Sequence, residues 1–123
     1  MKKSLLSILV LILLSIGCKE NEDPITYCGV ENPSENLTWL SQLTNELDDS
    51  YFGVYFYVTA GTYQGQTVFL SKNCCPNCNS VALVYSCEGE FLGVLGRGGT
   101  GIEPTEVKDE VVIWRGTGMV CTV

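Results

Sequence analysis

The stretch NLTWLSQLTNELDDSYFGVYFYV, residues 36–58, decides the fold, because the spacing of its apolar residues changes halfway along. In the first half, Leu40, Leu43 and Leu47 recur at intervals of three and four residues. This spacing places the three leucines on one side of an α-helix. We therefore predict an amphipathic helix whose leucine face is buried against the rest of the domain.

The residues before this helix offer two starting points. Asn32 can cap the helix, Pro33 suits the first helical position, and Glu35 stands where the acid of a capping box belongs. Asn36 offers a second start, directly before Thr38. The sequence pattern leaves both starts open.

The second half of the stretch has a period of two residues, which is typical of a β-strand. Its apolar positions are Phe52, Val54, Phe56 and Val58. The positions between them hold Tyr51, Gly53, Tyr55 and Tyr57. We predict a strand with one apolar face and one tyrosine face.

Shorter strand patterns follow this first strand. They cover residues 66–71, 81–87, 90–95 and 110–115. Glu88 and Gly89 lie between two of them and resemble a tight hairpin turn, and short connections favour antiparallel pairing. The predicted fold class is α+β, with one N-terminal amphipathic helix packed on an antiparallel meander of about four or five strands and stapled by disulfides.

The first residues have the pattern of an export signal. Two lysines precede an apolar run, residues 5–16, which has the length of a secretory h-region and is shorter than the ~20 residues needed to cross a bilayer. Gly17 and Cys18 then resemble the cleavage box of bacterial lipoproteins, in which the cysteine receives fatty acids and becomes the first residue of the mature chain. We predict lipidation of Cys18, with ordinary signal cleavage as the alternative.

On this interpretation the chain has three parts. Residues 1–17 are a lipoprotein signal peptide, residues 18–27 are an acidic tether, and residues 28–123 form a single small domain. The segment KENED, residues 19–23, is similar to the acidic export signal that sends some Bacteroidota lipoproteins to the outer face of the outer membrane. Alternatively, these charges only keep the tether solvated. We expect lipid anchoring in the outer membrane, with the domain facing either the cell surface or the periplasm.

The charge of the mature chain excludes some partners. Removing residues 1–17 removes two lysines and no acid, so five basic and 14 acidic residues remain, for a net charge of −9. Nucleic acids and anionic membrane faces both reward positive charge, so neither is an expected partner. The chain has no histidine, which is the commonest general base and metal ligand. We predict no enzymatic activity, no cofactor and no metal.

Six cysteines remain once Cys18 is acylated, and an even number fits a disulfide framework in an oxidising compartment. They are Cys28, Cys74, Cys75, Cys78, Cys87 and Cys121. A bond between the adjacent Cys74 and Cys75 would strain the local geometry, so these two are expected to reach different partners. We predict that Cys28 pairs with a distant cysteine such as Cys121, and that Cys87 pairs with one of the 74–78 cluster.

Two alternative roles for the C-x-x-C spacing of Cys75 and Cys78 are less favoured. With Cys87 these residues resemble a zinc or iron–sulfur knuckle, but a thiolate cage must stay reduced, and export places the chain in an oxidising compartment. A thioredoxin-like redox pair opens a helix, whereas a strand pattern follows Cys78. Structural disulfides are therefore the favoured interpretation.

Three tyrosines are candidates for a binding surface. Tyr55, Tyr57 and Tyr63 would present amphipathic rings of the kind enriched at interfaces. Tyrosine also suits a half-exposed sheet face, where cross-strand packing alone explains it, and this interpretation is favoured. Trp39 is predicted to belong to the core.

The segment GRGGTG, residues 96–101, spells a G-x-G-x-x-G pattern after a strand. A dinucleotide site also needs a helix that begins there, but Pro104 and two acids follow. A glycine-rich loop is therefore predicted. The loop is long, residues 96–109, which makes it a candidate contact element or flap, with Arg97 as a candidate binding residue.

Several of these features together resemble a family of small Bacteroidota lipoproteins described as a domain of unknown function. In that family a Trp-Leu helix precedes strands, a Tyr-x-Cys-x-Gly hairpin and a glycine-rich stretch. The corresponding residues here are Trp39 and Leu40, then Tyr85, Cys87 and Gly89, and then residues 96–101. The resemblance implies no activity.

We expect a lipid-anchored outer-membrane protein that acts as a binding or interaction module. Its partner would be a protein or a small molecule, and it would contact the membrane through its N-terminal lipid. The alternative is a small inhibitor of a protease or another hydrolase, because a small, rigid, acidic domain with a long loop suits that role.

Overall fold

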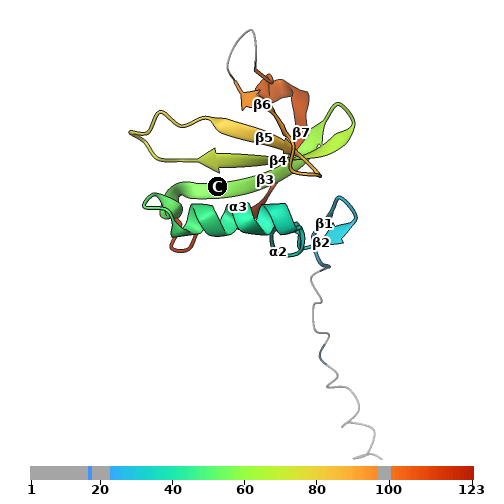
Figure 1. Ribbon diagram of the computed structural model, residues 1–123, viewed down its shortest axis with the longest axis horizontal. Coiled ribbons are helices and arrows are strands. Elements are labelled where there is room, and N and C mark those ends of the chain that lie inside the picture. Colours follow the sequence, from blue (N-terminus) through green and yellow to red (C-terminus); the bar gives the residue numbers. More distant parts are fainter. Residues whose placement is uncertain (1–16, 18–22, 97–100) are drawn as a thin grey trace, which may run out of the picture.

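A computed structural model of the chain describes residue 17, residues 23–96 and residues 101–123 (Figure 1). The predicted signal peptide except Gly17, the predicted lipidation site Cys18, most of the predicted tether and Arg97 lie outside the described residues. Within the described part, no helix is both long and apolar enough to cross a membrane.

A five-stranded antiparallel sheet forms the centre of the domain, with the strand order β6-β5-β4-β3-β7 (Figure 1). Its strands are β3 (Phe56–Tyr63), β4 (Gln66–Asn73), β5 (Ala82–Ser86), β6 (Phe91–Leu95) and β7 (Val107–Arg115). The first four form a meander, and β7 pairs with the free edge of β3. The predicted antiparallel sheet with a helix is therefore confirmed.

A small two-stranded sheet precedes the helix, so the helix is not the first element of the domain as predicted. It consists of β1 (Thr26–Tyr27) and β2 (Val30–Glu31). Its two-residue turn has positive φ at both Cys28 and Gly29 (56° and 72°), which is the backbone of a type I′ hairpin. Strands of two residues are too short for an alternation of apolar and polar residues to predict them from the sequence.

The helical region consists of two segments, so both predicted starts are used. They are α2 (Pro33–Asn36) and α3 (Thr38–Asp49), separated by Leu37 in an extended conformation. The predicted cap is wrong, because Asn32 has a left-handed backbone (φ 46°) and its side chain makes no capping hydrogen bond. The amide of Asn36 instead donates to the carbonyl of Glu31 at 2.7 Å.

The leucine face of α3 packs on one side of the sheet, as predicted. Leu40 is fully buried in a cluster with Val58, Ala60 and Phe69. Leu43, Leu47 and Trp39 pack against the same cluster, which confirms Trp39 as a core residue. The leucine side chains of α3 therefore form part of the apolar core between this helix and strands β3 and β4.

Residues 51–55 do not belong to the strand that the alternating pattern predicts. Gly53 lies against the end of α3, where an added Cβ would stand 2.5 Å from the carbonyl oxygen of Asp48. The chain therefore turns through a short 3-10 helix, η1 (Gly53–Tyr55), before β3 begins. Tyr51 is left 93% exposed.

A second core cluster lies on the sheet face opposite α3. Val68, Leu70 and Val84 are covered there by Ile102 and Val107, which follow the glycine-rich segment. Within the described part of the predicted loop, Ile102 is thus a core residue, while the 3-10 helix η2 (Pro104–Glu106) that follows it is exposed. Because both sides of the sheet are covered, β3 is buried throughout its centre, whereas Tyr57 and Tyr63 near its ends are half-buried.

Three disulfides link elements at the two ends of the domain. The pairs are Cys28–Cys87, Cys74–Cys121 and Cys75–Cys78. The framework and the separate partners of Cys74 and Cys75 are confirmed. Cys28 pairs with a distant cysteine as predicted, but this cysteine is Cys87 and not Cys121, so the predicted pairing of Cys87 with the 74–78 cluster is wrong. The turn between β1 and β2 lies at one end of the sheet, while the C-terminal segment returns to the other end, where Val120 donates to the carbonyl of Val54 at 3.0 Å.

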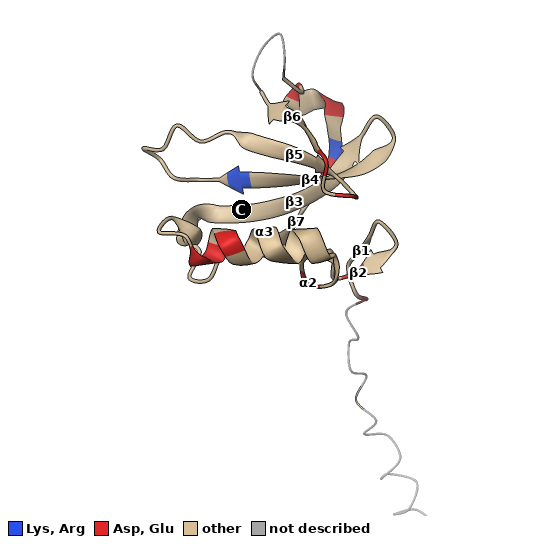
Figure 2. Cartoon of the chain, in the orientation of Figure 1, with Lys and Arg blue, Asp and Glu red and all other residues tan. Residues whose placement is uncertain are grey.

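Two polar contacts fasten the strand and helix ends. Thr117 donates from its backbone N–H and its hydroxyl to the Asp48 carboxylate, at 2.6 and 2.8 Å. These hydrogen bonds hold the pKa of Asp48 below its ordinary value of 3.8. Across the sheet, Lys72 forms an ion pair with Glu110, which also accepts a hydrogen bond from Thr59. Figure 2 shows the acidic last turn of α3 and the basic end of β4.

Candidate functional site

A cleft of about 270 Å³ opens between the β3–β4 and β5–β6 hairpins, and we call it the hairpin cleft. Its lining residues are Tyr63, Gln64, Gln66, Thr67, Val68, Ser86, Glu88, Glu90 and Leu92. Side chains alternate between the two faces of a strand, and Val68 belongs to the core cluster opposite α3. The hairpin cleft is therefore the open polar end of that sheet face.

The β3–β4 turn forms one wall of the hairpin cleft. Gln64 and Gly65 both have positive φ (50° and 75°), so they form a two-residue turn of type I′. The turn places Tyr63 opposite Gln66 in the last strand pair. The Gln64 amide then donates to the Tyr63 hydroxyl oxygen at 3.1 Å, which leaves the Tyr63 hydroxyl hydrogen free to donate.

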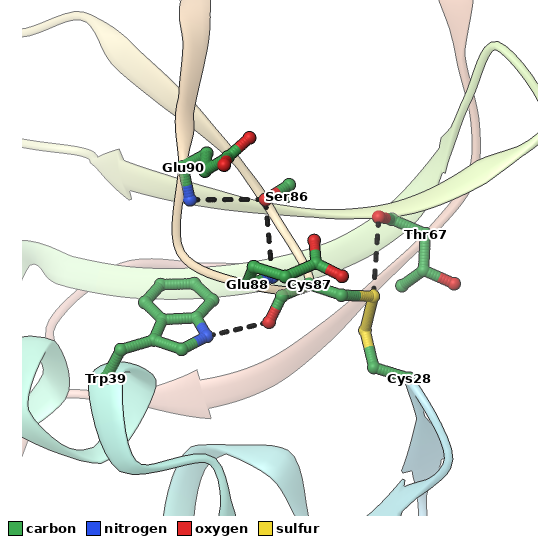
Figure 3. Close-up of a disulfide and its surroundings, with 7 residues drawn as sticks. All are labelled: Cys28, Trp39, Thr67, Ser86, Cys87, Glu88 and Glu90. Carbon is green, nitrogen blue, oxygen red and sulfur yellow. Dashed lines mark hydrogen bonds between the residues drawn. A yellow bond between two sulfur atoms is a disulfide. The ribbon is translucent and has the colours of Figure 1, made fainter.

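The β5–β6 turn forms the other wall, and Ser86 holds it in place. The Ser86 hydroxyl oxygen accepts from the backbone N–H of Glu88 at 3.3 Å and from that of Glu90 at 3.1 Å (Figure 3). The Ser86 backbone adds bonds to Glu90 and Gly89. Both acidic residues of the hairpin cleft are therefore attached to a fixed backbone.

Trp39 supports the same turn from the helix side. Its indole N–H donates to the carbonyl of Cys87 at 2.8 Å (Figure 3). Its ring covers Gly89, where an added Cβ would stand 2.8 Å from ring carbons, and it stacks on Tyr85 at 5.7 Å between centroids. This packing partly buries Tyr85, and the loss of solvent raises the pKa of its hydroxyl. The tryptophan and the Tyr-x-Cys-x-Gly pattern therefore form one structural support.

The Cys28–Cys87 disulfide completes this support. It ties the β1–β2 turn to the β5–β6 turn, and the Cys87 sulfur lies 3.8 Å from the Thr67 carbonyl oxygen (Figure 3). Thr67 itself lines the hairpin cleft. The β5–β6 wall is thus held by a covalent bond and by hydrogen bonds that involve Trp39 and Ser86, which preorganises it before any ligand arrives.

The lining of the hairpin cleft is negatively charged. Its charged members are Glu88 and Glu90, both exposed at the rim, and the other lining residues are neutral. Two carboxylates repel phosphate or carboxylate ligands and attract cations. The ring of Tyr63, with Val68 and Leu92, adds apolar contact area to the hydroxyl and amide groups. The volume lies just below the range of about 300–1,000 Å³ typical of drug-sized ligands, so a compact molecule fits.

The three candidate tyrosines do not form one surface. Tyr63 lines the hairpin cleft, while Tyr55 lies in η1, where its ring packs near Phe52. Tyr57 pairs with Lys72 on one side and Arg115 on the other. Since Tyr57 and Tyr63 are six positions apart in β3, they lie about 20 Å from each other.

The C-x-x-C pair is oxidised and is not followed by a helix. Residues 79–81 after Cys78 are irregular, and β5 begins at Ala82. Disulfide sulfurs are not thiolates, so these cysteines do not provide metal ligands in this state. Across residues 23–96 and 101–123, no group of three or more His, Cys, Asp or Glu side chains is arranged to hold a metal ion.

Comparison with known proteins gives no match: no family model, no curated protein and no solved structure resembles the chain at a significant level. The α+β domain with three disulfides is therefore characterised by its own geometry. Functional reasoning starts from the hairpin cleft and the disulfide-braced ends.

Proposed function

We propose that the chain is a lipid-anchored binding module of the outer membrane, without catalytic activity, and that the hairpin cleft is its ligand site. The observation that carries the proposal is a polar cleft in which Trp39, Ser86 and the Cys28–Cys87 bond fix the β5–β6 wall, opposite the tight turn of the β3–β4 wall. Three disulfides among the described cysteines support an oxidising compartment outside the cytoplasm.

The ligand of this proposal is compact and either cationic or rich in hydroxyl groups. Glu88 and Glu90 supply acceptors and negative charge, while Tyr63 and Gln66 offer both donors and acceptors. The Tyr63 ring can also cover an apolar or ammonium face of the ligand. Anionic ligands are disfavoured because each would meet two carboxylates.

A titration of the purified mature domain tests the ligand class. Choline, glucose and inorganic phosphate serve as probes, and backbone amide NMR shifts are followed. We expect choline or glucose to shift the amides of residues 63–68 and 86–92, and phosphate to leave them unchanged. The proposed site is contradicted if neither choline nor glucose shifts these amides, or if phosphate shifts them equally.

Matched variants separate the cleft from general surface effects. Tyr63→Ala and Glu90→Gln should weaken probe binding at least severalfold. Tyr51→Ala and Glu46→Gln make the same chemical changes at exposed positions outside the cleft and should leave binding unchanged. Equal losses in both sets would place the binding elsewhere.

The anchor is tested separately, by intact mass and free-thiol counting on protein from native membranes. We expect fatty acids on Cys18 as the first residue and no titratable thiol among the six domain cysteines. A bare amino terminus would remove the lipid anchor from the proposal, and six free thiols would remove the oxidising compartment.

A hydrolase inhibitor is the second candidate, and one feature favours it. The β4–β5 loop projects from the end of the domain opposite β1 and β2 (Figure 1). Cys74–Cys121 fixes its base, Cys75–Cys78 closes its first turn, and Asn77 is exposed between them. Incubation with a panel of periplasmic and extracellular hydrolases should then give stoichiometric inhibition that Asn77→Ala weakens and Tyr63→Ala does not.

A further inference from the structure

We infer that the Cys75–Cys78 bond is a thiol–disulfide exchange site that dithiols can reduce in the folded protein, whereas the other two disulfides are structural. The first reason is the length of chain that each bond closes. Cys75 and Cys78 are separated by three positions, against 59 for Cys28–Cys87 and 47 for Cys74–Cys121. Since a disulfide restricts the unfolded chain more as its loop lengthens, the short bond contributes least to folding.

The second reason is the surroundings of each bond. Cys28 packs against the core cluster beneath α3, and the sulfur of Cys121 lies 3.3 Å from the Tyr55 carbonyl oxygen. All six disulfide cysteines are half-buried, but Cys75 and Cys78 lie outside the strands, and the residues between them, Pro76 and Asn77, are both exposed. An attacking thiolate must approach a sulfur directly, and the exposed neighbours in this loop leave room for that approach.

The third reason is that few contacts of the fold depend on this bond. The loop is fastened at its start by the Cys74 N–H, which donates to the Tyr55 carbonyl at 3.0 Å, and by Cys74–Cys121. On its other side it is fastened by β5, which pairs with β4 through Leu83 and Ser71. Opening the Cys75–Cys78 bond therefore frees only a short turn between two held ends.

The exchange is a two-electron transfer from a dithiol of either a small molecule or a protein. One thiolate of the dithiol attacks a sulfur of the bond, forms a mixed disulfide and releases the other cysteine sulfur, which takes up a proton. The second thiol of the reductant then displaces the attacked cysteine and becomes oxidised with the first. The dithiol ends as a disulfide, and Cys75 and Cys78 end as two thiols.

The local structure also sets how strongly reducing the dithiol must be. A helix that begins at a C-x-x-C pair stabilises the thiolate and makes the pair a strong oxidant. Residues 79–81 are irregular and lead into a strand, so that stabilisation is missing here. The Cys75–Cys78 bond is therefore a weak oxidant that only a strongly reducing dithiol opens, and the site is independent of ligand binding in the hairpin cleft.

Differential alkylation of the folded mature protein tests the inference. The protein is exposed to limiting dithiothreitol without denaturant, free thiols are alkylated over time, and peptides are mapped. We expect Cys75 and Cys78 to be labelled at least about tenfold faster than the other four cysteines. Equal rates for all six, or early labelling of Cys28, Cys87 or Cys121, overturn the inference.

A double variant keeps the test independent of partial unfolding. Cys75→Ser/Cys78→Ser should fold, should lose clearly less melting temperature than Cys28→Ser/Cys87→Ser, and should lose the fast phase of labelling. A drop in melting temperature as large as that of Cys28→Ser/Cys87→Ser would show that the bond is structural and would contradict the inference.

Discussion

Gly89→Ala tests the support beneath the hairpin cleft, and its cost can be worked out from the structure. Gly89 has φ of +83°, a left-handed conformation that costs other residues about 1–2 kcal/mol. A Cβ there would also stand 2.8 Å from two ring carbons of Trp39. The Trp39 indole is held by its hydrogen bond to Cys87, so it cannot move away freely, and overpacking adds about 1–3 kcal/mol. We expect a total loss of about 2–5 kcal/mol.

Gly65→Ala is the matched control, because Gly65 has a similar φ of +75° and nothing within 4 Å of the added Cβ. The free energy of unfolding of Gly65→Ala should therefore fall only by the cost of the left-handed backbone, about 1–2 kcal/mol. Urea unfolding of both variants, with disulfides intact, gives the two free energies of unfolding on the same scale. In a domain of this size each kcal/mol lowers the melting temperature by about 4–8 °C, so thermal melts provide a second measurement.

The result that refutes this reasoning is a Gly89→Ala variant no less stable than Gly65→Ala. That outcome would mean that the Trp39 ring gives way without cost, and that the β5–β6 turn is not fixed from the helix side. The preorganised β5–β6 wall on which the proposed ligand site depends would then lack its main support.

Three further predictions concern other parts of the domain. Replacing the Cys28–Cys87 pair with serines should cost about 4 kcal/mol, against about 2 kcal/mol or less for the Cys75–Cys78 pair, because the closed loops differ so much in length; denaturant unfolding measures both. Because the folded pKa of Asp48 is depressed, its contribution is present above the ordinary value of 3.8 and is lost as pH falls through the folded pKa; melting temperatures of the parent and Asp48→Asn should therefore differ near neutral pH and converge in acid. Ser86→Ala removes the acceptor of two backbone N–H groups and should cost about 1–2 kcal/mol in the same unfolding assay, while Ser34→Ala on α2 should have little effect.

The sequence predicts those parts of the fold that depend on local periodicity. The spacing of Leu40, Leu43 and Leu47 identifies the buried helix face, and alternating patterns identify most strands of the main sheet. The pattern fails at residues 51–55 because Gly53 packs against the end of α3, and tertiary contact overrides the alternation there.

The disulfide pairing and the cleft are harder to predict, because both depend on contacts between distant residues. Nothing near Cys28 in the sequence indicates that the β5–β6 turn will lie beside it. The walls of the cleft come from two hairpins about twenty residues apart along the chain, so their meeting is set by the strand order. One local signal was available: Gln64-Gly65 between two strand patterns is a two-residue turn that would have placed Tyr63 at its edge.

The position of the Cys28–Cys87 bond has a mechanical consequence. Tension applied through the amino-terminal tether reaches Cys28 and passes through the sulfur bridge directly into the turn after β5. The 58 residues between these cysteines, which include α2, α3, β3 and β4, lie within a closed covalent ring and outside the direct covalent path of that load. With the lipid anchor that we propose, a pull on the tether would therefore not extend the chain between Cys28 and Cys87.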